Sequence, residues 1–116
     1  MTVASGQSMG GVTGLRVTLE THTHGVVVAS IGGALGMAST SELDRELSLA
    51  LAAGPCRILV LDLSEIDVLD STGLRALWTI RQTMREVGAS LVLRRPSGAV
   101  LRVLDAAGLT AMFDVA

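Results

Sequence analysis

The sequence lacks the features by which several classes of protein are recognised. It has no run of lysine or arginine, and 9 basic against 11 acidic residues give a net charge of −2. Nucleic-acid-binding proteins usually carry a basic patch, so this class is disfavoured. The single cysteine, Cys56, excludes an intrachain disulfide and a multi-cysteine zinc site. Cys56 precedes an apolar run, where a free cysteine is usually a small buried residue rather than a redox group.

Long hydrophobic segments are also missing. Residues 21–41 carry no charged side chain, but their glycine, serine, threonine and histidine leave an apolar part too short to cross a bilayer. Residues 1–14 are polar and lack the positively charged start of a signal peptide. We therefore expect a cytoplasmic protein without membrane insertion.

Aromatic residues make up only 2% of the chain, whereas hydrophobic residues make up 49%. The core must therefore be aliphatic, and a chain of 116 residues fits one domain. Residues 1–14 show no hydrophobic periodicity and predict a disordered segment. The sequence thus predicts one folded domain over residues 15–116.

Hydrophobic periodicity predicts an alternation of strands and helices. Strands are expected at 15–20 and 26–31, joined by the turn at 21–25 into an antiparallel hairpin. Further strands are expected at 57–63, covered on both faces, and at 90–93, with a short last element near 111–115. The expected helices cover residues 40–53, 72–87 and about 96–108. This order predicts an α/β fold with a mixed, mostly parallel sheet and helices packed on it.

Two local patterns concern the start of the first expected helix, 40–53, and the residues that precede it. Ser39 and Glu42 fit a capping box, in which each side chain accepts a backbone N–H of the other residue. Residues 32–36 are rich in glycine, lack the spacing of a phosphate-binding loop and predict a flexible link.

The sequence offers no convincing catalytic or metal site. His22 and His24 are its only histidines, and they lie in the early turn without a third ligand nearby. The acidic and hydroxyl residues at the junction between the expected strand 57–63 and the expected helix 72–87 therefore have no histidine for a catalytic triad. The motif Gly-x-Ser-x-Gly is also absent. We expect no enzyme activity, no cofactor and no metal.

That junction, Asp70-Ser71-Thr72-Gly73, allows two interpretations. Asp, Ser and Thr are preferred at helix N-caps, where each stabilises a helix by about 1 kcal/mol. A hydroxyl at a helix N-terminus is also a plausible modification switch, because the helix dipole tolerates added negative charge. Spacing alone does not choose between a cap and a switch.

A wider block around this turn resembles a known family. Residues 62–74, Asp-Leu-Ser-x-Ile-Asp-x-Leu-Asp-Ser-Thr-Gly-Leu, are similar to the signature of STAS domains, named for sulfate transporters and anti-sigma-factor antagonists. Residues 99–109 resemble the third helix of the family and its Gly-Leu exit. The element order fits from about residue 15 to the end, so the resemblance implies a single STAS-type domain.

A freestanding chain of this size is similar to the bacterial anti-sigma-factor antagonists. The resemblance implies that the unphosphorylated protein binds an anti-sigma factor, itself a serine kinase, and so releases a sigma factor. It implies that the kinase phosphorylates Ser71 and that a phosphatase restores it. The resemblance assigns the partner-binding platform to five consecutive residues: Asp70, Ser71, Thr72, Gly73 and Leu74.

One departure from the family pattern concerns the partner surface. After the second strand the family usually carries Gly-acid-x-Asp, but this chain has Ala34 and Gly36 at the acidic positions. An alternative function therefore remains open. The chain could be a STAS accessory subunit of a lipid or anion transporter complex without a phosphoswitch.

Overall fold

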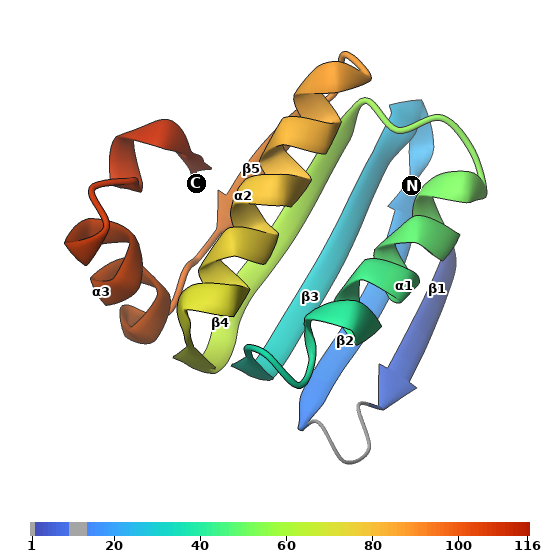
Figure 1. The fold of residues 1–116 in the computed structure, drawn as a ribbon. Coiled ribbons are helices and arrows are strands. Elements are labelled where there is room, and N and C mark those ends of the chain that lie inside the picture. Colours follow the sequence, from blue (N-terminus) through green and yellow to red (C-terminus); the bar gives the residue numbers. More distant parts are fainter. Residues whose placement is uncertain (1, 10–13) are drawn as a thin grey trace.

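Six strands form one sheet within the residues that the computed structural model describes, 2–9 and 14–116. Their order across the sheet is their order in the chain (Figure 1). Strands β1, β2 and β3 pair antiparallel, whereas β3 to β6 pair parallel. The strands are Thr2–Met9 (β1), Leu15–His22 (β2), Val26–Leu35 (β3), Ile58–Leu69 (β4), Ser90–Arg94 (β5) and Asp114–Val115 (β6).

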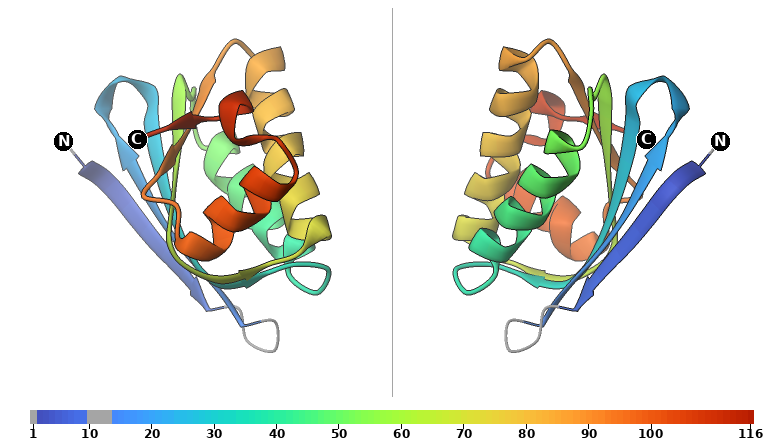
Figure 2. Two further views of the ribbon diagram at one scale, coloured as in Figure 1. Left: turned by 90° about the vertical axis from the view of Figure 1, so that its left-hand side faces the viewer. Right: turned by 90° about the vertical axis from the view of Figure 1, so that its right-hand side faces the viewer.

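Three α-helices lie on one face of the sheet (Figure 2). They are Thr40–Ala52 (α1), Ser71–Glu86 (α2) and Gly98–Ala106 (α3), with 3-10 turns at Thr23–Gly25 (η2) and Thr110–Met112 (η3). The α/β class and the mostly parallel sheet with an N-terminal hairpin are thereby confirmed. None of the helices in the described ranges combines the length and the apolar character that a membrane crossing requires.

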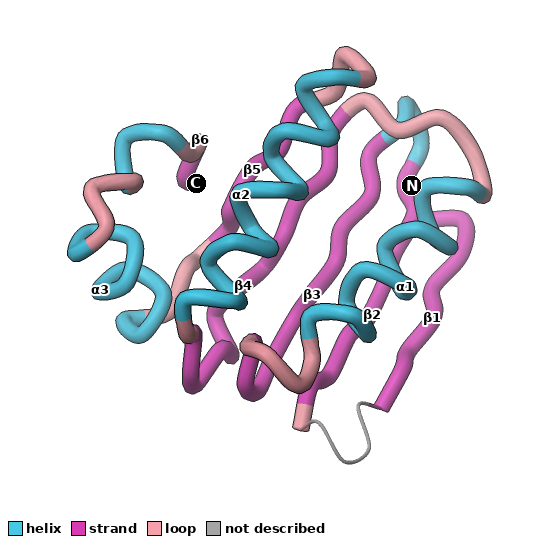
Figure 3. The backbone as a smooth tube through the Cα atoms, in the orientation of Figure 1, coloured by secondary structure: helices cyan, strands magenta, loops and turns pink. Residues whose placement is uncertain are grey.

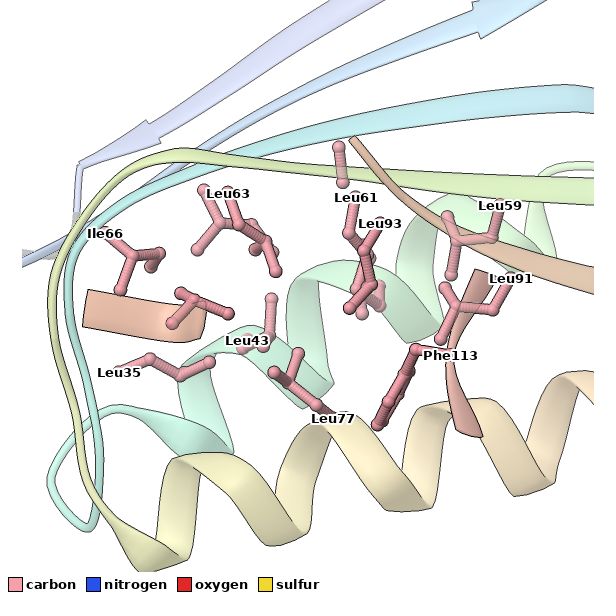
Figure 4. Packing of buried hydrophobic residues seen from close by; sticks show 14 of the residues in the cluster. Leu35, Leu43, Leu59, Leu61, Leu63, Ile66, Leu77, Leu91, Leu93 and Phe113 are labelled. Carbon is pink, nitrogen blue, oxygen red and sulfur yellow. The ribbon is translucent and has the colours of Figure 1, made fainter. Parts of the chain in front are cut away.

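The position of the helices corrects one prediction. The apolar run 57–63 was expected to be covered on both faces, but only one face of the sheet carries helices. Leu59, Leu61 and Leu63 are fully buried there, with Leu77 of α2 packed against the same core (Figure 4). Val60, pointing the other way, is only half-buried. The sheet grows in one direction from β3 to β6, so right-handed crossovers place every helix on the same side.

The N-terminal segment differs from the expectation of disorder over residues 1–14. Thr2–Met9 form strand β1, which pairs with β2 from Thr2↔His22 to Met9↔Arg16. Strand pairing uses backbone groups, so it does not require the hydrophobic alternation that this segment lacks. Residues 1 and 10–13 lie outside the described residues, and the domain limits 15–116 stay a prediction.

The glycine-rich stretch 32–36 was predicted to be a flexible link, but most of it is strand. Strand β3 continues to Leu35 and pairs with β4 as far as Leu35↔Leu69. Gly33 has a φ of +94°, and a Cβ there would lie 2.0 Å from the carbonyl oxygen of Gly14. Glycine is therefore required here for close approach of the backbone rather than for flexibility.

The capping box at the start of α1 is also not formed as predicted. Ser39 is the N-cap residue, but its side chain makes no capping hydrogen bond. Its hydroxyl instead donates to the Ala34 carbonyl at 2.8 Å and accepts the Gly36 N–H at 3.0 Å. Ser39 thus fixes the β3–α1 loop, which Figure 3 shows beside the start of α2.

An ion-pair cluster lies on the face of the sheet that carries no helices, near the end of β5. Asp62 of β4 is buried and accepts hydrogen bonds from Arg94 at 3.0 Å, from Arg95, and from the Ser64 hydroxyl at 2.7 Å. Burial alone would raise the pKa of Asp62, but Arg95, Ser64 and Arg94 together hold it well below the ordinary value. Asp62 therefore carries its charge throughout the neutral range.

Gly73 sets how closely α2 approaches the sheet. This glycine is buried, and a Cβ placed on it would lie 2.2 Å from the carbonyl oxygen of Leu35 and 2.7 Å from a methyl carbon of Leu69. The first turn of α2 thus rests directly on the ends of β3 and β4. Any side chain at position 73 must displace backbone.

Replacing Asp62 by asparagine is expected to lower the free energy of unfolding at pH 7 by about 1–3 kcal/mol, because the charge-assisted hydrogen bonds are lost. The pKa of Asp62 in the folded protein lies below its value in the unfolded chain, which is about 4. The ionised carboxylate therefore stabilises the fold above about pH 4, and this contribution is progressively lost as the pH falls further. Urea unfolding of wild type and Asp62→Asn should therefore show a difference that shrinks in acid. A difference independent of pH would contradict the assignment.

Replacing Gly73 by alanine is expected to lower the free energy of unfolding by about 1–3 kcal/mol, because the methyl group forces α2 away from the sheet. Urea unfolding measures this loss. The matched control is Gly54→Ala: Gly54 has open space where the Cβ would stand, so a change within about 0.5 kcal/mol is expected. Equal midpoints for Gly73→Ala and wild type would refute the close contact.

Candidate functional site

The predicted turn lies at the edge of the sheet where β3 and β4 end. Asp70 is the single residue between β4 and α2, in extended backbone conformation with φ −99° and ψ −176°. Its N–H donates to the Leu35 carbonyl at 3.3 Å, and its carbonyl accepts the Leu74 N–H at 2.9 Å. The turn is thus tied to β3 on one side and begins the helix on the other.

The Asp70 carboxylate joins two segments that lie far apart in the sequence. One oxygen, Oδ1, accepts the Gly73 N–H at 2.9 Å and caps α2. The other, Oδ2, accepts the Met37 N–H of the β3–α1 loop at 3.2 Å. The Gly73 N–H above all, with those of Met37 and Thr72, lowers the pKa of Asp70 below its ordinary value. Asp70 is therefore a fixed negative charge beside Ser71.

Ser71 is the first residue of α2, and it is exposed. The side-chain cap of this helix comes from Asp70, and no hydrogen bond engages the Ser71 hydroxyl within the described part of the chain. Of the two interpretations of the turn, the cap thus belongs to Asp70. The hydroxyl of Ser71 is left accessible to solvent and to other proteins.

The remaining platform residues differ in accessibility. Thr72 is half-buried and lines an open groove of about 330 Å³ between α1 and α2. Gly73 is buried under the turn, and Leu74 is half-buried against the core. The structure therefore brings all five predicted residues together, but only Asp70 and Ser71 stand fully at the surface. Their role in partner binding stays a prediction.

The other reactive groups considered from the sequence lie elsewhere. His22 ends β2 and His24 lies in η2. Cys56 is half-buried against the core, and burial raises the pKa of its thiol, which keeps it protonated at neutral pH. Within residues 2–9 and 14–116, no three histidine, cysteine, aspartate or glutamate side chains gather in a way that could hold a metal.

Sequence reasoning missed one feature of the site, the loop residue Met37. Its backbone binds Asp70, and 80% of the residue is exposed. The sequence places it next to the start of a helix, where a methionine carries no signal of contact with a residue 33 positions away. Only the fold shows that it lies beside the turn of Ser71.

Comparison with known proteins finds a family, a sequence relative and solved structures that resemble this chain. The STAS domain family matches residues 18–116. BtrV of Bordetella bronchiseptica, named as a candidate anti-sigma factor antagonist, is 32% identical over 92 residues, which are 79% of this chain and 78% of that protein. The crystal structure of an anti-sigma factor antagonist from Mycobacterium paratuberculosis shares 29% identity and a TM-score of 0.70, covering 87% of this chain and 84% of that one.

A more distant structure shares the fold. SpoIIAA, an anti-sigma factor antagonist solved in its unphosphorylated form, has a TM-score of 0.72 at 22% identity, covering 86% of this chain and 87% of that one. The family match runs from Thr18, within β2, through β6 and includes the turn at Asp70 and Ser71. The chain belongs to the STAS domain family.

Proposed function

We propose that this chain is an anti-sigma factor antagonist, a regulatory protein without enzyme activity that acts in the bacterial cytoplasm. In its unphosphorylated form it binds an anti-sigma factor with serine kinase activity and so releases a sigma factor. Phosphorylation of Ser71 ends this binding, and a phosphatase restores it. Asp70, Ser71, Thr72, Gly73 and Leu74 form the platform that the partner contacts.

The observation that carries the proposal is that Asp70 and Ser71 have different roles within the turn. Asp70 supplies the helix cap, so the neighbouring Ser71 hydroxyl is exposed and not required by the fold. The named relatives support the antagonist role, and the resemblance of residues 62–74 supports Ser71 as the acceptor. A kinase can thus modify this position without breaking a structural hydrogen bond.

The charge of a phosphate at Ser71 affects the fold and the complex differently. A phosphoserine adds about −1.5 to −2 charge at pH 7. The helix dipole favours that charge, and the exposed Arg75 follows one turn later on the same helical face. Against a partner fitted to a neutral hydroxyl, however, the phosphate beside Asp70 adds repulsion and a desolvation cost. The fold should therefore tolerate phosphorylation while the complex dissociates.

We expect an anti-sigma-factor serine kinase with ATP to label wild type at Ser71. Peptide mapping after incubation locates the phosphate. Ser71→Ala should abolish labelling, whereas Thr83→Ala, which removes an exposed hydroxyl of α2 outside the platform, should leave it in place. Label on another residue, or no label with any such kinase, would refute the switch.

The affinity for the same kinase should differ among three forms of the protein. Wild type and Ser71→Ala are expected to bind alike, and Ser71→Glu about thirty- to a thousandfold more weakly, corresponding to about 2–4 kcal/mol. The urea midpoint of Ser71→Glu should stay near that of wild type, because an acidic residue is tolerated in the first turn of a helix. Equal binding by all three would exclude a phosphoswitch, and retention of a transporter subunit by all three would instead indicate the accessory role.

A further inference from the structure

A pocket of about 240 Å³ opens on the face of the sheet opposite to the helices, the face seen edge-on in Figure 2. Residues that pair directly on neighbouring strands, such as Ser30 and Asp62, point to the same face of a sheet. We name this hollow the open-face pocket. Six polar or charged residues of β2, β3, β4 and the segment after β5 line it: Arg16, Thr18, Ser30, Asp62, Glu65 and Arg95.

The backbone is irregular where the pocket lies. Strand β4 bulges here, because it advances three residues, from Asp62 to Glu65, while β3 advances two. A Cβ at Gly32 would lie 2.5 Å from Nη2 of Arg16, so this glycine leaves the space through which Arg16 reaches across β3 to Glu65. Bulges and strand glycines often mark places where a side chain is redirected or another group approaches closely.

Arg95 is oriented by the buried Asp62. Its backbone has φ +49°, in the left-handed region. A residue other than glycine is uncommon there, and such strained residues cluster at ligand sites. Nε of Arg95 donates to Asp62 Oδ2 at 3.2 Å, and Nη2 donates to the same oxygen. Nη1 has no partner among the residues that the structure describes. Arg95 thus holds one N–H₂ group available in a fixed guanidinium.

Other polar groups of the pocket are also available. Thr18 and Ser30 are half-buried, and neither hydroxyl has a hydrogen-bond partner within residues 2–9 and 14–116. The ion pair of Arg16 with Glu65 is long, at 3.4 Å, and its side chains are 48% and 75% exposed. Such a pair contributes little to stability, so a ligand replaces it at small cost. Polar groups that converge in a hollow are typical of small-molecule sites.

The charges of the pocket select the class of ligand. Two arginines and two carboxylates line it, so the lining has no net charge. The Asp62 carboxylate is already occupied, because it accepts five hydrogen bonds from Ser64, Arg94 and Arg95. The groups left for a ligand are therefore cationic on one side, Arg95 and Arg16, and anionic on the other, Glu65. A polyanion would be repelled by the two carboxylates, whereas a small zwitterion is attracted at both ends.

We propose that the open-face pocket binds a free α-amino acid with a small polar side chain. The α-carboxylate lies against Arg95 and Arg16, because guanidinium groups bind carboxylates through paired hydrogen bonds. The α-ammonium group lies against Glu65, and the hydroxyls of Thr18 and Ser30 bind the polar side chain. The site lies on the face opposite to the helices and does not include Ser71, so this inference is independent of the proposed function.

The test is isothermal titration calorimetry of wild type with each of the standard amino acids. L-serine or L-asparagine should bind with a Kd below about 1 mM. Two analogues of serine test the two charges: ethanolamine lacks the carboxylate, and 3-hydroxypropanoate lacks the ammonium group. Both should bind about tenfold more weakly than L-serine, or worse. Binding of inorganic phosphate without binding of any amino acid would overturn the inference, and so would the absence of all binding.

Two variants assign the charges to residues. Arg16→Gln should abolish the preference for L-serine over ethanolamine, and Glu65→Gln should abolish the preference over 3-hydroxypropanoate. Each should weaken L-serine binding about tenfold. The urea midpoints should stay near that of wild type, because both side chains are exposed.

The matched control is Arg45→Gln, which removes an exposed arginine of α1 on the opposite face and should bind as wild type does. Wild-type affinity in Arg16→Gln and Glu65→Gln would place the bound amino acid elsewhere and overturn the inference. Ser71→Ala should bind amino acids as wild type does. A failure of kinase binding therefore leaves this inference intact, and a failure of amino-acid binding leaves the proposed function intact.

Discussion

The carboxylate of Asp70 is the interaction on which the geometry of the site depends. One oxygen caps α2 through Gly73, and the other holds the β3–α1 loop through Met37. Because hydrogen bonds to N–H groups stabilise the ionised form, the same contacts keep Asp70 charged. A single side chain therefore fixes the start of the helix, the position of the loop and the charge next to Ser71, so these three properties change together.

The one-sided sheet explains why this turn is presented to solvent. The strands β3 to β6 follow one another across the sheet, and their crossovers place all helices on one face. The C-terminal ends of β3 and β4 meet at one edge, where the first turn of α2 rests on the Leu35 carbonyl through the bare backbone of Gly73. The buried contact at Gly73 and the exposed hydroxyl at Ser71 are thus two sides of the same turn.

Local patterns in the sequence predicted the elements, but not the contacts between them. The period of Leu77 and Met84 specifies the core face of α2, so that helix was placed within one residue of its observed ends. The uncovered face of the sheet could not be foreseen, because it depends on strand order rather than on any single strand. Strand β1 was missed because its pairing relies on backbone groups. Ser39 was assigned a local cap, yet its hydroxyl bonds backward to Ala34.

Within the site, Asp70 and Ser71 could be predicted because they are adjacent in the sequence. The contact of Met37 with Asp70 could be found only from the fold. This difference also changes how the missing acid at position 36 is understood. From the sequence alone, Gly36 is a position where the acid of the family pattern is missing from the expected partner surface. In the structure, a side chain at 36 would collide with Asp70, so the glycine permits the carboxylate to reach the Met37 N–H. Restoring an acid at position 36 would therefore displace Asp70 and release the loop, and it would not simply add a charge to an unchanged surface.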